Sequence, residues 1–272
     1  VTTASDGIAI GSETVVDNYK GIAVGAYSRA KGRQSTVIAN NVRDSNYSTA
    51  SGDRSQVYGA ETTVSGNKSV AIGDTNTVAS ARTYVMGNNI NAAAGTDDSL
   101  AFGTSAAVEG ANTIAMGNTA KALTESSISI GQNAESGKVD KFDGKKSIAI
   151  GYEAKSMGTS TIAMGYNAKS ENGHDGVSIG TYAKSGNEKA ITIGSYSSAS
   201  GAQSIVIANN YNSDNSFNSD KSTATGRRAI VMGAESHATA EQALAIGDKN
   251  TVASARTYAL GNNINVAAGA DD

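Results

Sequence analysis

Few residues of this chain belong to the types that carry catalysis or hold metal ions. The 272 residues include two histidines and no cysteine, so neither thiolate sites nor disulfides are available. His174 and His237 stand alone, without further ligands at the spacing of a metal site. No nucleophile-elbow or phosphate-binding motif occurs in the sequence. We therefore predict a protein that is not an enzyme and that uses no cofactor.

Two acidic pairs are the remaining candidates for a metal site. Asp97 and Asp98, and again Asp271 and Asp272, follow short glycine-containing segments. Paired carboxylates at a turn can bind Ca²⁺. Neither pair matches the G-G-x-G-x-D nonapeptide of calcium-binding β-rolls. We therefore expect solvated turns at both places and no metal.

Three lysines recur at one position of a short repeat. The phrases KKSIAIGYEAKS and TSTIAMGYNAKS begin at residues 145 and 159 and place Lys155 and Lys169 in equivalent positions, and Lys184 is the next equivalent. Stacked strands are about 4.8 Å apart, so the three ammonium groups would form a column. Like charges side by side repel each other. Such a column could attract acidic glycans or an acidic protein face, and a merely solvated stripe is the alternative.

Three long polar segments are further candidates for a ligand-binding surface. Residues 40–52, 133–147 and 209–226 are rich in turn-forming residues and should loop out of the repeat. Tolerated surface insertions are the alternative. Their aromatic side chains, which we include among the candidate binding residues, are Tyr47, Phe142, Tyr211 and Phe217.

The whole chain is built from one repeat, an apolar run closed by a marker residue. The 17 markers are Gly11, Gly25, Ala39, Gly59, Gly73, Gly87, Gly103, Gly117, Gly131, Gly151, Gly165, Gly180, Gly194, Ala208, Gly233, Gly247 and Gly261. Of the 16 intervals, 11 are 14 residues long and the others are longer. A minimum period with insertions only is typical of a solenoid. Fourteen residues accommodate two five-residue strands and two tight turns, and leave no room for a helix.

The two strands of each repeat have different patterns. In the first, residues one and three before the marker are large and apolar and the residue between them is small or apolar, as at 148–150. This pattern predicts burial on both faces. In the second, residues three and five after the marker are small and the residue between them is polar, as at 154–156. That alternation predicts one buried face and one solvated face.

The first strands therefore have one apolar face too many for a single chain. A roll of two-stranded coils has one interior and buries one face of each strand, so the other face would form a stripe larger than a soluble monomer usually exposes. We predict self-association with closed cyclic symmetry, and the periodicity leaves open whether two or three chains close the ring. Side chains expected in the core of the assembly or of the roll are Ile10, Ile72, Met116, Ile150, Met164, Ile193 and Ile246.

These repeats resemble those of a known family. The segments SVAIG at 69–73, TIAMG at 113–117 and SIAIG at 147–151, with the small-polar alternation that follows, are similar to the head repeats of YadA-like trimeric autotransporter adhesins. The resemblance covers essentially the whole chain. It implies an all-β fold, a left-handed parallel β-roll solenoid of about 17 two-stranded coils, assembled as a homotrimer.

The resemblance also implies a function and a location. A head of this family would sit on the surface of a Gram-negative bacterium, anchored in the outer membrane, and act in virulence by attachment to host cells. Expected partners are extracellular-matrix proteins such as collagen, fibronectin or laminin, or cell-surface glycans, and autoaggregation is a further expectation. A purely structural spacer in a surface fibre is the alternative. A left-handed β-helix acyltransferase fits poorly, because it needs hexapeptide repeats and a catalytic histidine.

The remaining features concern organisation. We expect one head solenoid over residues 1–272, with an internal duplication in which about 21–98 resembles about 190–272, since TVASARTY recurs at 77 and 251. The chain has no recognisable signal peptide, heptad stalk or anchor, so membrane contact is expected only through a C-terminal anchor outside this chain. With 22 basic and 25 acidic residues, no basic excess indicates nucleic acid.

Overall fold

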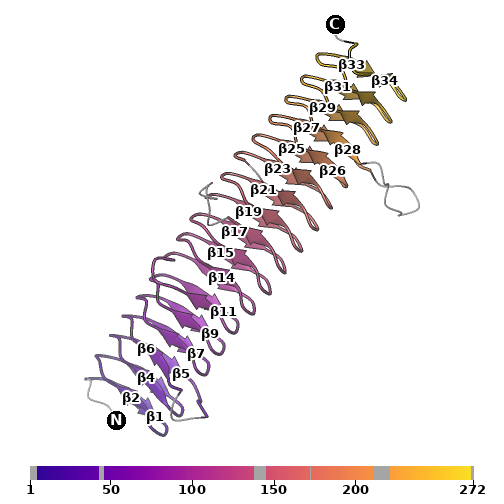
Figure 1. Ribbon diagram of the computed structural model, residues 1–272. Coiled ribbons are helices and arrows are strands. Elements are labelled where there is room, and N and C mark those ends of the chain that lie inside the picture. Colours follow the sequence, from indigo (N-terminus) through magenta and orange to yellow (C-terminus); the bar gives the residue numbers. More distant parts are fainter. Residues whose placement is uncertain (1–4, 43–45, 138–144, 172, 211–220, 271–272) are drawn as a thin grey trace. The chain divides into compact units, whose positions relative to one another are not determined.

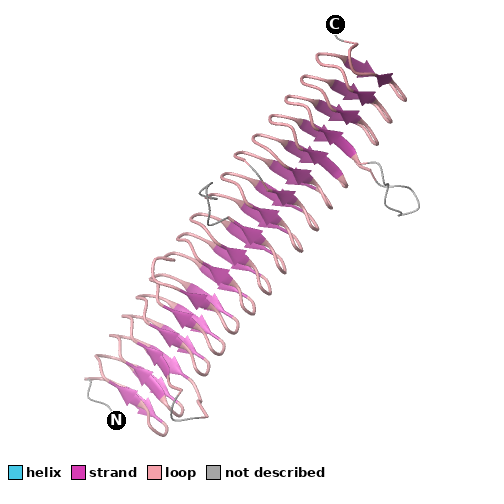
Figure 2. Ribbon diagram, in the orientation of Figure 1, coloured by secondary structure: helices cyan, strands magenta, loops and turns pink. Residues whose placement is uncertain are grey.

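The computed structural model describes residues 5–42, 46–137, 145–171, 173–210 and 221–270. Every regular element in these ranges is a short β-strand, and no helix occurs among them (Figure 2). The chain makes about 17 turns of a parallel solenoid with a 14-residue period, as the sequence predicts. Its turns are grouped in two compact units, Val1–Asn133 and Ala134–Asp272. Odd-numbered strands are the first strands of the coils, and even-numbered strands are the second strands (Figure 1).

The first unit contains strands β1 to β17. Its first strands are β1 (Ile8–Ile10), β3 (Ile22–Val24), β5 (Thr36–Ile38), β7 (Gln56–Tyr58), β9 (Val70–Ile72), β11 (Tyr84–Met86), β13 (Leu100–Phe102), β15 (Ile114–Met116) and β17 (Ile128–Ile130). Its second strands are β2 (Val15–Val16), β4 (Ser28–Ala30), β6 (Ser48–Ala50), β8 (Thr63–Val64), β10 (Thr77–Val78), β12 (Asn91–Ala92), β14 (Ala107–Val108) and β16 (Lys121–Ala122).

The second unit contains strands β18 to β34. Its first strands are β19 (Ile148–Ile150), β21 (Ile162–Met164), β23 (Val177–Ile179), β25 (Ile191–Ile193), β27 (Ile205–Ile207), β29 (Ile230–Met232), β31 (Leu244–Ile246) and β33 (Tyr258–Leu260). Its second strands are β18 (Glu135–Ser136), β20 (Lys155–Ser156), β22 (Lys169–Ser170), β24 (Lys184–Ser185), β26 (Ser197–Ala199), β28 (Ser222–Ala224), β30 (His237–Ala238), β32 (Thr251–Val252) and β34 (Asn265–Val266).

Within each unit the strands of successive coils pair in parallel and in the register of the repeat. Ile148 lies opposite Ile162, and Lys155 lies opposite Lys169, one period further along the chain. The strands are shorter than predicted, at two or three residues instead of five. The turns take up the difference, because each of the two turns of a coil holds a residue in the left-handed region, such as Glu153 with φ 54° and Ser160 with φ 56°.

The interior of the roll is lined by small side chains. The middle residue of a first strand points inward, and Ala71, Ala115 and Ala163 are fully buried there. The last residue of a second strand meets it from the other side, as Val64 and Val78 do. The buried face predicted for the second strands is confirmed by this arrangement. Since the interior is lined mainly by alanine, valine, serine and threonine, with Ile90 as its largest fully buried side chain, most large residues of the first strands point outward.

Buried polar side chains link one coil to the next. The Thr62 hydroxyl donates a 2.8 Å hydrogen bond to the Gly73 carbonyl and accepts one from the Asn76 amide at 3.2 Å. Asn76 continues the series, since its Nδ2 donates to the Gly87 carbonyl at 2.7 Å. Such bonds satisfy polar groups that would otherwise be buried without a partner. They explain why the residue three after the marker is small and often polar.

The marker glycine is required by the stacking of the turns. At Gly117, φ is +136° and a Cβ atom would lie 2.5 Å from the carbonyl oxygen of Gly131, the marker of the next coil. The two alanine markers, Ala39 and Ala208, come directly before the segments 40–52 and 209–226, and we call these two places the exits. They are absent from the residues with positive φ. An alanine marker therefore signals an insertion. The prediction that the segments 40–52 and 209–226 loop out over their whole length is wrong, because β6 and β28 lie within them and pair with the neighbouring coils.

A buried asparagine closes the stack at each of these exits. Asn210 is 1% exposed, and its Nδ2 donates to the Tyr196 carbonyl at 3.0 Å. Its Oδ1 accepts from the Ser222 hydroxyl and the Glu235 amide, both at 2.8 Å. Asn41 makes the corresponding bonds in the first unit, with Nδ2 to the Tyr27 carbonyl and Oδ1 from the Ser48 hydroxyl and the Glu61 amide. At each exit, one asparagine side chain thus forms hydrogen bonds to the coil before it and to the coils after it.

Candidate binding surfaces

The large residues of the first strands lie outside the roll. Of the seven side chains predicted for the core of the roll or of an assembly, five are exposed in the single chain: Ile10 (60%), Ile72 (37%), Met164 (38%), Ile193 (40%) and Ile246 (38%). Met116 and Ile150 are half-buried. The interior of the roll is therefore excluded as their place, and the prediction that they form the core of an assembly stays open.

These residues form an unbroken row in each unit, which we call the outer apolar row. The row consists of the last residue of every first strand, and the parallel register places successive members side by side. Its members in the first unit are Ile10, Val24, Ile38, Tyr58, Ile72, Met86, Phe102, Met116 and Ile130. In the second unit they are Ile150, Met164, Ile179, Ile193, Ile207, Met232, Ile246 and Leu260.

The lysine column lies on the outward face of the second strands, as the repeat predicts. Lys155 is opposite Lys169, and Lys169 is opposite Lys184. Two glutamates form ion pairs with the lysines of the column. Glu135 lies 3.6 Å from the Lys155 ammonium, and Glu171 lies 2.9 Å from that of Lys184 and 4.0 Å from that of Lys169. The like charges are thus compensated in part by acidic residues, which the sequence pattern did not indicate.

A polar groove opens beside this column. Its volume is about 500 Å³, and it lies along β22, β24, β26 and β28 of the second unit. Among the described residues of its lining, three are lysines, none is acidic, and the one aliphatic residue is alanine. The lining consists of Asn167, Lys169, Tyr182, Ala183, Lys184, Ser197, Ser198, Lys221 and Thr223. This surface, which we call the lysine groove, can accept anions and hydroxyl groups.

A row of stacked tyrosines runs along the turns of the same unit. The rings of Tyr152 and Tyr166 are parallel within 7° with centroids 5.3 Å apart, and Tyr182 meets Tyr166 edge-on at 5.3 Å. Tyr196 stacks on Tyr182 at 5.0 Å. The hydrogen bond with Tyr182 raises the pKa of Tyr166. Sequence analysis missed this row, although a tyrosine one or two residues after the marker in four successive repeats was a readable signal.

Of the four aromatic residues predicted as binding residues in the long segments, the structure describes one, Tyr47. Tyr47 is half-buried, and its ring packs against the Arg29 guanidinium at 3.2 Å and against the edge of Tyr27 at 5.7 Å. It holds the end of its segment to the roll. Phe142, Tyr211 and Phe217 lie outside the described residues. Residues 138–144 and 211–220 of these segments lie outside them as well, whereas β18 and β28 belong to the roll.

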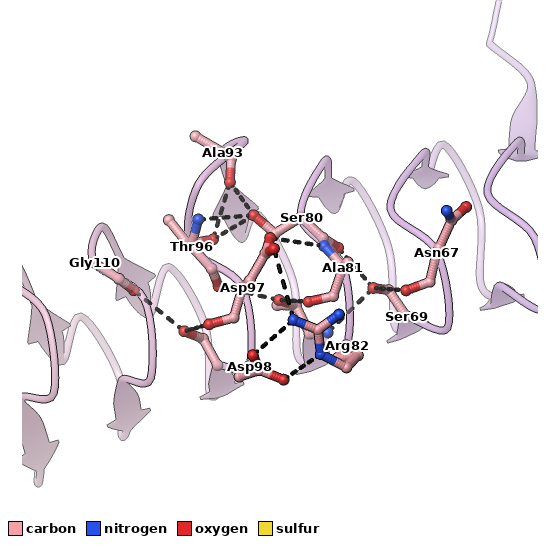
Figure 3. A network of polar contacts seen from close by, with 12 residues as sticks. Asn67, Ser69, Ser80, Ala81, Arg82, Ala93, Thr96, Asp97, Asp98 and Gly110 are labelled. Atoms are coloured by element: carbon pink, nitrogen blue, oxygen red, sulfur yellow. Dashed lines mark hydrogen bonds and ion pairs between the residues drawn. The ribbon is translucent and has the colours of Figure 1, made fainter.

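The acidic pair of the first unit is used within the fold. Figure 3 shows that the Asp98 carboxylate accepts two hydrogen bonds from Arg82, at 2.5 and 2.8 Å, while Asp97 accepts one from the Ala81 amide at 3.0 Å. The hydrogen bond from Arg82 lowers the pKa of the Asp98 carboxyl group. These bonds use both carboxylates as acceptors within the turns. No cluster of three metal-ligating side chains occurs in the ranges that the structure describes.

The histidines serve no joint site. His237 lies on the outward face of β30, where its Nδ1 is 2.8 Å from the Thr223 hydroxyl. His174 is exposed in the turn before β23. Among the described residues, no helix could span a membrane.

The repeats of the solenoid match a family model described as "YadA head domain repeat (2 copies)". The matched segments are residues 109–134, 143–168, 157–183 and 224–250. These segments are similar to YadA head domain repeats. Together with the parallel β-solenoid fold, the match is consistent with a YadA-like head. No curated protein matches the chain.

The YadA head match carries a coarse functional assignment. The YadA head family is a family of non-enzymatic adhesin domains, and it indicates an adhesin-type segment of a surface fibre. The matches at 143–168 and 157–183 include β19 to β23, so Lys155 and Lys169 of the lysine column lie in matched repeats, whereas Lys184 lies just beyond them.

Proposed function

We propose that this chain is the head of a bacterial surface adhesin, which assembles as a homotrimer and attaches the cell to host tissue. The outer apolar row is the observation that supports the assembly. It runs through every first strand of each unit, with Tyr58 as its one member that carries a polar group, and members such as Phe102 and Ile207 are 46% and 42% exposed in the single chain. A contiguous apolar surface of this kind marks an interface in a soluble protein.

A closed ring is the assembly that covers every copy of the row. Each chain would turn the outer faces of its first strands toward a common axis, and the second strands would face outward. Rotational symmetry then buries the same row of every chain, whereas an open arrangement would leave one row uncovered. The choice of three chains over two rests on the YadA head resemblance.

Attachment would use the surfaces that the assembly leaves outside. The second strands carry polar side chains on that face, and the long segments leave the roll at two of its markers. Three copies of each surface would bind together, so weak individual contacts would add up through avidity. The partners we propose are matrix proteins such as collagen, fibronectin or laminin, or cell-surface glycans. Display on the outer membrane, a role in virulence and autoaggregation belong to the same proposal.

Binding of the purified chain to immobilised matrix proteins and to fixed host cells tests the adhesin function. We expect saturable binding, and weaker binding of an Ile193→Lys variant, because a lysine in the outer apolar row would separate the chains and remove avidity. The matched control is Thr251→Lys, which adds the same charge to the outward face of β32. Absence of binding to every matrix protein and cell type would contradict the adhesin proposal and favour a spacer in the fibre.

A further inference from the structure

We propose that the lysine groove binds a linear polysaccharide that carries sulfate or carboxylate groups. This inference rests on the adhesin function proposed above and names the chemistry of one partner and the place where it binds.

The positive charge of the groove is the first reason. Lys169, Lys184 and Lys221 line it, and none of the other described residues of the lining is acidic. The nearest acid on the column is Glu171, whose single carboxylate is shared by Lys184 at 2.9 Å and Lys169 at 4.0 Å. One carboxylate cannot satisfy six ammonium protons, so the lysines keep donors for an incoming anion. A sulfate or carboxylate group of a ligand would compete with Glu171 for them.

The spacing of the groups is the second reason. Lys169 and Lys184 occupy paired positions of β22 and β24, and Ser198 and Thr223 continue the same column on β26 and β28. Each step along the column is the distance between neighbouring strands, about 4.8 Å. The groove therefore repeats its polar groups at a regular interval along the stack. An extended polymer with regularly placed anionic and hydroxyl groups can meet several of them at once.

The hydroxyl groups of the lining are the third reason. Tyr182, Ser198 and Thr223 supply them, and Tyr182 belongs to the tyrosine row. Its neighbours Tyr166 and Tyr196 pack against its ring and hold it in place in the lining. The hydroxyl of Ser197 does not contribute, because it is buried and donates to the Ala208 carbonyl. Hydroxyl groups both donate and accept hydrogen bonds, as the hydroxyls of a sugar do. A saccharide can therefore be bound between, as well as at, its charged groups.

The absence of an apolar pocket in this lining argues against an acidic protein as the ligand. The strongest contacts of protein interfaces are aromatic and other large side chains buried in well-packed pockets. In the part of the lysine groove that the structure describes, alanine is the only aliphatic residue of the lining. Tyr182 is the one aromatic residue among the described lining residues. A ligand bound through charge and hydroxyl groups fits this lining better.

The groove stays open in the proposed trimer. Lys169 and Lys184 project from the outward face of the second strands, while Ala163 of the adjacent first strand fills the roll interior behind them. The outer apolar row projects from the opposite sheet. The surface proposed for self-association and the lysine groove therefore lie on opposite sides of the roll, and one can be tested without disturbing the other.

Heparin binding by the purified chain, measured by titration calorimetry at low salt, tests the inference. The net charge of the chain is −3, so non-specific attraction of a polyanion is not expected. We expect saturable binding that weakens as the salt concentration rises. Lys184→Gln and Lys169→Gln should each weaken it by about twofold to fivefold, as exposed ion pairs do. Glu171→Gln should strengthen binding, because it removes the competing carboxylate. Lys249→Gln, which changes a lysine of the same unit outside the groove, should have no effect.

Two probes separate the alternatives. Chemically desulfated heparin should bind more weakly than heparin, and poly-glutamate should bind more weakly than either. Equal binding of poly-glutamate would assign the groove to acidic proteins and overturn the inference. Absence of heparin binding, or binding that is the same in the Lys184→Gln and Lys249→Gln variants, would also overturn it. Because matrix-protein binding and chain mass are measured separately, such a failure would leave the adhesin proposal intact.

Discussion

Glycine at the marker position illustrates how single residues control the stack. Gly117 combines a left-handed φ of +136° with a carbonyl of the next coil 2.5 Å from where its Cβ would lie. Gly95 of the same unit also has a positive φ, +92°, but nothing lies within 4 Å of its Cβ position. A comparison of alanine substitutions at these two glycines therefore distinguishes the cost of backbone strain from the cost of steric conflict between coils.

We expect Gly117→Ala to destabilise the chain by more than Gly95→Ala. A non-glycine residue in a strained backbone conformation costs about 1–3 kcal/mol, and only at Gly117 must the backbone of the next coil also move. Urea unfolding, followed by circular dichroism, measures both variants. Equal loss of stability would mean that φ alone, and not the stacking of the turns, requires the marker glycine.

The lysine column and the tyrosine row show which surface features could be predicted from the sequence. The lysine column was predictable because Lys155, Lys169 and Lys184 keep one position in the repeat. The glutamates that neutralise part of it were not, since Glu171 reaches the column from beyond the end of β22. The tyrosine row was missed because Tyr152 and Tyr166 follow the marker by one residue whereas Tyr182 and Tyr196 follow it by two, so the stack crosses two columns of the repeat.

At the scale of elements, the asparagines at the two exits matter most. Asn41 and Asn210 occupy equivalent places in the duplicated halves, and each bonds to a carbonyl of the preceding coil and an amide of the following one. The roll can therefore continue in register although a segment of different length leaves it at each place. The sequence indicated that the repeat tolerates insertions, but the dipeptide Asn-Asn alone did not reveal a buried anchor.

We expect Asn210→Ala to destabilise the second unit by about 2–4 kcal/mol, because it leaves buried partners on three coils without hydrogen bonds. Hydrogen exchange followed by mass spectrometry should show faster exchange at the Glu235 amide, which loses its acceptor. Asn209→Ala is the matched control, since the neighbouring Asn209 is exposed. The anchoring role would be wrong if both variants exchanged at the same rate and unfolded at the same urea concentration.

The elements also show where prediction from pattern succeeded. The 14-residue period fixed the parallel register and two strands per coil, since each coil must close before the next can stack. Strand length was overestimated, because the left-handed residues in both turns were not visible in the sequence. The sequence did not show which face of each first strand points into the roll, because both faces are apolar. Packing decides it: alanine fits the narrow interior at the middle position, and isoleucine or methionine does not.

At the scale of the whole molecule, the central claim is that the outer apolar row is an interface between copies of the chain. The periodicity predicts a surplus apolar face, and the structure places that face outside each unit. The number of chains was not predictable from the repeat, because dimers and trimers would bury the same side chains.

Sedimentation equilibrium of the purified chain over a range of concentrations tests this claim most directly. We expect a mass of three times 27.4 kDa, and a lower mass for Ile193→Lys but not for Thr251→Lys. The control distinguishes a specific loss at the outer apolar row from a general effect of added charge. A stable monomer of 27.4 kDa at all concentrations would contradict the account, because the row would then be exposed to solvent in the native protein.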